Sequence, residues 1–160
     1  MRYPNAQRLN QVASNDEEEG DIRASAVRGL ADLTSLGAMV LPDFAATEAA
    51  HLSALSALLV QLIESGTPAL SCTAGEVGAK LLAAGCLESA HLLGSLLKLF
   101  LNAELGAAQD DSDVEDEAGQ TAHNSRAGLQ QVLALFFTSY FSFAALTGKI
   151  SASPEATEEL

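Results

Sequence analysis

The chain has 160 residues, enough for one domain with its own core, and a formal net charge of −13. Aromatic residues make up only 5% of it and Trp is absent. Leu and Ala dominate and are strong helix formers, so we expect an all-α fold. The acidic balance disfavours a protein that grips nucleic acid phosphates unaided.

Two cysteines, Cys72 and Cys86, occur in helical context without clustered histidines. This pattern favours small buried thiols over a metal site. Residues 1–15 are polar and lack the apolar stretch of a secretory signal. We therefore expect a reducing compartment, the nucleus or the cytoplasm.

Residues 1–20 are interpreted as a flexible, acidic lead-in. They show little apolar periodicity, Pro4 limits any helix, and an acidic run precedes Gly20. From Asp21 a helix is expected, and Gly37 would end it. Its apolar stripe consists of Ile22, Ala26, Leu30 and Leu33.

A connector is expected over residues 39–44, because Pro42 restricts Leu41 to extended geometry. Thr47 is the expected cap of the next helix, whose apolar side chains continue to Ile63. The Ser-Gly-Thr-Pro sequence at residues 65–68 ends this helix.

Residues 74–102 predict two helices separated by Gly85, which suits a left-handed C-terminal cap. Glu88 or Ser89 would begin the second helix, with a favourable charge or a capping oxygen. Together they form the expected αα-hairpin, around which the rest of the chain is arranged. The second helix is apolar on nearly two faces, so we expect it to be an inner helix.

Residues 104–124 are polar and acidic, and a disordered loop is expected there. Ser112 lies among acids, with Glu115 three residues on, and is a candidate site for an acidophilic kinase. The alternative is an unmodified, solubilising loop. The acids imitate the start of a calcium loop, but Asp116 stands where Gly is required, so we reject a calcium site.

Ser125 is the expected cap of a final apolar helix that extends to Leu146 without a charged residue after Arg126. Its length raises the alternative of a membrane-associated helix. Polar residues along it, Gln130 and Thr138 among them, favour a buried helix of a repeat. Residues 147–160 form an expected tail, and the ending resembles a cut from a longer protein.

Paired helices at roughly forty-residue spacing predict a HEAT/armadillo-like α-solenoid over residues 21–146. The segment from Gly20 to Leu33 has the charged start and Ala-rich face of a HEAT helix. Asp21 would favour the helix N-terminus, and Arg23 either bridges to a neighbouring turn or lies solvated in the first turn.

The chain resembles the condensin subunit 3 family, the HEAT-repeat subunits of condensin also called chromosome-associated protein G. Four stretches carry the resemblance, in the family's order. They are residues 21–44, the helix AGEVGAKLL at 74–82, the helix SAHLLGSLLKLFLN at 89–102, and LQQVLALFFTSYFSFA at 129–144. The last is the most specific, although Gln130, Val132 and Thr138 replace the family's usual Arg, Cys and Pro.

The resemblance implies a non-catalytic subunit without a cofactor, a small-molecule substrate or a membrane partner. Such a subunit binds the kleisin and, together with it, DNA, while the SMC ATPase pair hydrolyses ATP and the complex condenses mitotic chromosomes. It implies a location in the nucleus and cytoplasm and on mitotic chromosomes. By charge alone, the candidate partner or DNA contacts are Arg23, Arg28, Lys80, Lys98 and Arg126.

Two other functions stay open. A HEAT-like scaffold or adaptor of another complex, in transport or with a phosphatase, would show the same helical pattern. A membrane-associated helical protein would use the final helix. An enzyme is the least favoured reading, because the chain contains no phosphate-cradling GxxxxGK[ST] motif and His51, His91 and His123 are scattered.

Overall fold

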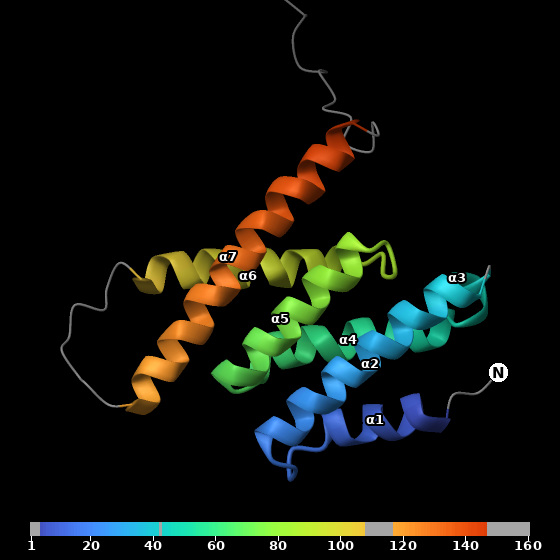
Figure 1. Cartoon of the computed structure of the whole chain (residues 1–160), viewed down its shortest axis with the longest axis horizontal. Helices are drawn as coiled ribbons and strands as arrows, with labels where there is room; N and C mark the ends of the chain where they lie inside the picture. The colour runs from blue at the N-terminus through green and yellow to red at the C-terminus, as the bar shows by residue number, and fades with distance from the viewer. Residues whose placement is uncertain (1–3, 42, 108–116, 147–160) are drawn as a thin grey trace, which may run out of the picture.

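The computed structural model describes the chain over residues 4–41, 43–107 and 117–146 (Figure 1). Within these ranges it forms helices joined by turns, and no strand. The helices are α1 (Pro4–Ser14), α2 (Gly20–Val40), α3 (Phe44–Thr47), α4 (Ala49–Ser65), α5 (Pro68–Ala83), α6 (Ala90–Ala107) and α7 (Glu117–Leu146). The predicted all-α class is confirmed.

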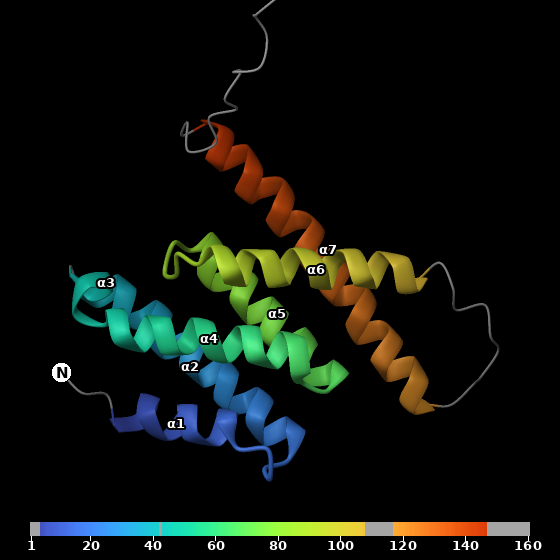
Figure 2. The ribbon, with the colours of Figure 1, turned by 180° about the vertical axis from the view of Figure 1, so that it is seen from behind.

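The helices lie in two layers. In Figure 1, α2, α5 and α7 lie in front, and Figure 2 shows α1, α4 and α6 on the opposite side. Neighbours within the front layer contact each other, and each front helix also packs on the rear helix that precedes it. The front helices begin at Gly20, Pro68 and Glu117, a repeat of about fifty residues that is longer than the spacing of roughly forty expected from the sequence. This stacking of helical pairs is an α-solenoid, as predicted.

Helix α5 is the inner helix of the fold, in contact with α2, α4, α6 and α7. Two buried glycines of α5, Gly75 and Gly78, allow neighbouring helices to approach it closely. A Cβ atom on Gly75 would lie 2.9 Å from Leu99 of α6 and 3.2 Å from Leu129 of α7. The expectation that α6 is the inner helix was wrong, since its Leu97 and Leu101 are 41% and 50% exposed. Small residues decide how closely neighbouring helices approach α5, and the count of large apolar residues does not reveal this.

The predicted turn between α5 and α6 is confirmed. Gly85 has φ +69°, and its N–H donates to the carbonyl of Leu82 (3.1 Å), while the N–H of Cys86 donates to that of Leu81 (2.9 Å). These bonds form a Schellman cap. Ser89 caps α6, because its Oγ accepts the N–H of Leu92 at 3.2 Å.

The interpretation of residues 1–20 as a flexible lead-in was wrong for residues 4–14, which form α1. Pro4 is the first residue of that helix, where a missing N–H has no cost. Ala6 and Ala13 are buried against the core, and Leu9 packs at the position of Gly29 on α2. The helix is therefore held by tertiary packing, which its weak periodicity does not reveal.

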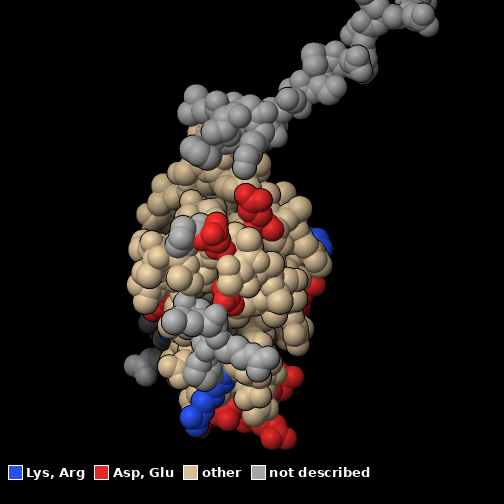
Figure 3. All heavy atoms as spheres, turned by 90° about the vertical axis from the view of Figure 1, so that its right-hand side faces the viewer, with Lys and Arg blue, Asp and Glu red and all other residues tan. Residues whose placement is uncertain are grey.

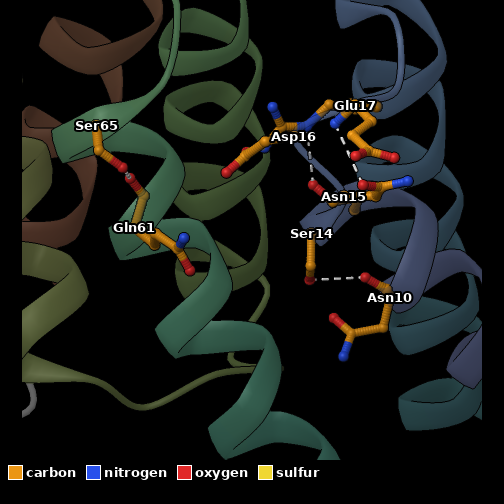
Figure 4. Close-up of polar contacts among 9 residues, drawn as sticks. Asn10, Ser14, Asn15, Asp16, Glu17, Gln61 and Ser65 are labelled. Carbon is orange, nitrogen blue, oxygen red and sulfur yellow. Dashed lines mark hydrogen bonds and ion pairs between the residues drawn. The ribbon is translucent and has the colours of Figure 1, made fainter.

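The acidic run forms the turn between α1 and α2 (Figure 4). The Ser14 hydroxyl donates to the Asn10 carbonyl at 2.8 Å, and the Asn15 side chain accepts the N–H of Glu17 at 3.2 Å. This local bonding supports a defined turn at the end of α1.

Two predicted helix boundaries near the turn between α2 and α4 were wrong. Gly37 does not end α2, which continues to Val40; Gly37 is buried, and the ring of Phe44 occupies the space where its side chain would begin. Thr47 belongs to the short α3, and α4 starts after Glu48 without a side-chain cap. Leu41 is extended before Pro42, as expected.

Ser125 does not begin the last helix, since α7 starts at Glu117. The expected loop at residues 104–124 is therefore helical at 104–107 and 117–124. Residues 108–116, with the candidate phosphosite Ser112, lie outside the described ranges, as does the expected tail at 147–160.

Among the helices that the structure describes, α7 included, none combines the length and the apolar character that crossing a bilayer requires.

Candidate partner-binding groove

A groove opens on the front layer between α5 and α7, and we call it the α5–α7 groove. Its volume is about 810 Å³. Helix α2 contributes Arg28 to its lining, and the turn after α5 contributes Gly85, Leu87 and Glu88. The remaining lining residues are Glu76, Val77, Ala79, Lys80, Leu82 and Ala83 of α5, and Val132, Leu135, Phe136, Ser139 and Tyr140 of α7.

The α7 wall of the groove is anchored from behind. Leu129 and Leu133 are buried, and the Phe137 ring packs against that of Phe100 on α6, with centroids 5.7 Å apart. On the groove side, the rings of Phe136 and Tyr140 lie 5.3 Å apart. The Phe100–Phe137 contact joins α7 to α6, and the Phe136–Tyr140 contact orders the groove side of α7 itself, so the groove has a preformed apolar wall.

Large apolar side chains of this wall face solvent. Leu135 is 64% exposed and Val132 is 39% exposed. Exposed apolar side chains that occur singly are common, but here they line one hollow with Phe136 and Tyr140. The groove is thus an open apolar surface without a covering element among the described residues.

Two of the predicted contact residues, Arg28 and Lys80, meet at this groove. The guanidinium of Arg28 donates to the hydroxyl of Thr73 on α5 at 3.4 Å, and Lys80 is exposed on α5. Neither side chain forms an ion pair within the described ranges. Glu76 and Glu88 also line the groove, so its formal charges balance, in a chain whose net charge is −13.

The other predicted contact residues are not part of the groove. Arg23 is buried: its Nη2 lies 2.8 Å from Asp16, and its Nε donates to the carbonyl of Ala13 at 3.1 Å. It thereby ties α2 to the turn that follows α1, the bridging alternative of the two considered. Lys98, on α6, is 3.8 Å from Glu64 of α4. Arg126 lies on α7, but its side chain is outside the described ones.

Sequence reasoning missed the apolar wall as a site. Its signal was present, since Val132, Leu135, Phe136, Ser139 and Tyr140 follow the i, i+3, i+4, i+7, i+8 spacing of one helix face. The residues were assigned to a buried helix because α7 is apolar on more than one side. Which of its sides is covered depends on where α6 ends and on how α5 crosses it.

The described residues contain no group of three or more His, Cys, Asp or Glu side chains that could hold a metal ion. Cys72 and Cys86 are half-buried thiols packed against the core. The α5–α7 groove is therefore suited to binding a partner through apolar contacts and through the two cationic side chains of Arg28 and Lys80.

Comparison with known proteins adds one finding. The family model described as "Nuclear condensing complex subunits, C-term domain" matches residues 5–146. The match begins within α1 and ends with α7, so it includes both walls of the groove. No curated protein and no solved structure matches the chain.

Proposed function

The chain belongs to the family of nuclear condensing complex subunits, whose C-terminal domain it contains, and we propose that it acts as a non-catalytic helical-repeat subunit of such a complex. In this role it binds the kleisin subunit and, together with it, DNA, beside an SMC ATPase pair that hydrolyses ATP. The family match over residues 5–146 is the observation that carries the proposal.

The architecture supports a binding role. Stacked helical pairs create extended surfaces on which partner segments lie, and the front layer here has an open apolar groove. Its floor is fixed by buried residues of α5, Val77 and Leu82 among them. A preformed surface of this kind loses little conformational entropy when a partner binds.

The charge distribution favours DNA binding through the assembled complex over binding by this chain alone. DNA affinity depends on cationic side chains that neutralise several phosphates along a track. Figure 3 shows separate acidic and basic side chains, with no continuous basic band among the described residues of that face. Other subunits of the complex would supply the cations of such a track.

This function places the protein in the nucleus and the cytoplasm, and on chromosomes during mitosis, where the complex condenses them. The nuclear part follows the family description, "Nuclear condensing complex subunits".

Affinity purification of the full-length protein that contains this sequence tests the proposal. The protein is tagged and purified with residues 5–146 present or deleted, and copurifying proteins are quantified by mass spectrometry. We expect kleisin and SMC subunits with the intact protein and a loss of kleisin on deletion. Transport or phosphatase subunits in their place would contradict the proposal and support a scaffold of another complex.

Titration with duplex DNA separates the two modes of DNA binding. At about 150 mM salt, where screening is strong, we expect no measurable binding by the isolated chain and salt-dependent binding by the purified complex. Equal affinity of the chain and the complex would contradict binding through the assembly.

A further inference from the structure

Arg28 and Lys80 stand out among the basic residues whose side chains the structure describes. Arg23 is paired with Asp16 and Lys98 with Glu64, whereas Arg8, Arg28 and Lys80 have no carboxylate within ion-pair distance in the described ranges. Arg8 lies on α1 and does not line the groove. Arg28 and Lys80 both line the α5–α7 groove, beside the exposed Leu135 and Val132. Among the residues that the structure describes, this acidic protein thus has two cations without an ionic partner beside an uncovered apolar wall.

We infer that the α5–α7 groove is the docking site for one amphipathic helix of another subunit, which carries an apolar face and a carboxylate directed at Arg28 and Lys80. The inference rests on the proposed function in one respect, that the helix comes from a subunit of the same complex. It adds the place of docking and the chemistry of the segment that binds there.

The shape of the wall favours a helix. Val132, Leu135, Phe136 and Tyr140 form a ridge at helical spacing along α7, and α5 provides the facing side. Side chains at i, i+3 or i+4 and i+7 of a second helix pack between such ridges. Because Leu135 is 64% exposed, the groove is open along its side, unlike the enclosed pockets that bind small molecules.

The charges favour an acidic side chain on that helix. A carboxylate near Arg28 and Lys80 would form the ion pairs that these cations lack within the described residues. Glu76 and Glu88 balance the formal charge of the lining, so one carboxylate suits the groove better than a row of them. For the same reason duplex DNA, with one charge about every 1.7 Å, suits it poorly.

The test uses the full-length protein and fluorescein-labelled peptides that tile the sequences of the subunits copurifying with it. Binding is measured by fluorescence anisotropy. We expect a binding peptide with apolar residues at i, i+3 or i+4 and i+7 and an Asp or Glu at its flank. Leu135→Glu should weaken this binding at least about tenfold, or about 1.4 kcal/mol.

A charge swap tests the predicted carboxylate. Lys80→Glu should weaken binding of the unchanged peptide. A peptide in which Lys replaces the acidic residue should bind the Lys80→Glu protein well again. The same peptide should bind the unchanged protein more weakly than the original peptide does. Leu101→Glu and Lys98→Glu are the matched controls. Both change exposed side chains of α6 that do not line the groove, so they should leave the affinity unchanged.

Three results would overturn the inference. They are peptide binding that is indifferent to Leu135→Glu, competition for the groove by duplex DNA, and a self-association of the full-length protein that Leu135→Glu abolishes. A different result would contradict the proposed function itself, namely a purified protein with which no kleisin copurifies. If the Leu135→Glu protein and the unchanged protein recover equal amounts of kleisin, the proposed function stands but the groove is not the docking site.

Discussion

The ring of Phe44 lies where a side chain on Gly37 would begin, so α2 and α3 meet at a position that only glycine fits without movement. Both residues are buried. We expect Gly37→Ala to destabilise the 160-residue chain by about 1–2 kcal/mol, because overpacking outweighs the helix preference of Ala. Urea unfolding followed by circular dichroism measures the change.

Gly94 provides the control for this prediction. It lies in α6, and nothing comes within 4 Å of the position that a Cβ atom would take there, so Gly94→Ala should stabilise the chain by about 0.5–1 kcal/mol. In the double variant Gly37→Ala/Phe44→Leu, part of the loss should be recovered, since the two sites are in contact. A neutral or stabilising Gly37→Ala would contradict the packing.

Arg23 should contribute to stability far more than its ionic partner does. Its side chain is 11% exposed and holds the Ala13 carbonyl, whereas the side chain of Asp16 is 81% exposed. We expect Arg23→Met to cost about 1–3 kcal/mol, because the carbonyl loses a charged donor. Asp16→Ala should cost less than about 1 kcal/mol, as is usual for an exposed ion pair. If urea unfolding shows equal losses of stability for Arg23→Met and Asp16→Ala, the ion pair and not the hydrogen bond to Ala13 accounts for the contribution of Arg23.

The turn after α5 should depend on backbone conformation alone. Gly85 has φ +69°, and nothing lies within 4 Å of its Cβ position. We expect Gly85→Ala to cost about 1–2 kcal/mol, the penalty for a left-handed residue with a side chain. Gly85→Asn should cost less, because Asn tolerates that conformation. If both variants unfold at the urea concentration of the unchanged chain, the positive φ angle is not required.

The joint between α6 and α7 should be sensitive to Phe137. It is 8% exposed and packs on Phe100, Phe136 and Phe141. We expect Phe137→Ala to cost about 3–5 kcal/mol, measured as a lower midpoint of urea unfolding. Phe141 is 44% exposed and stacks on the same ring, so Phe141→Ala should cost only about 0.5–1.5 kcal/mol. Similar losses for the two would contradict an anchored wall.

Local chemistry predicted a good part of the fold. The Leu- and Ala-rich composition, the extended Leu41 before Pro42, the cap at Gly85 and the capping oxygen of Ser89 all depend on a few neighbouring residues, and the structure confirms them. The resemblance of residues 129–144 to condensin subunits also agrees with the family match.

Tertiary packing decided what the sequence could not reveal. Helix α1 is held by contacts with α2, and the place of Gly37 inside a helix depends on a ring seven residues later. The groove arises because α7 is apolar on several sides and α6 covers only some of them. Arg28 and Lys80 are 52 positions apart in sequence, and only the packing of α2 on α5 brings them to one surface.

Chemical acetylation of lysines is the most direct measurement of the central claim, that the α5–α7 groove is occupied in the assembled complex. The isolated protein and the purified complex are treated with isotopically distinct reagents, and the modification of each lysine is compared by mass spectrometry. Lys80 should react in the isolated protein and be protected in the complex, while Lys98, whose side chain is 73% exposed on α6, reacts in both. Equal reactivity of Lys80 in the two samples would contradict the claim.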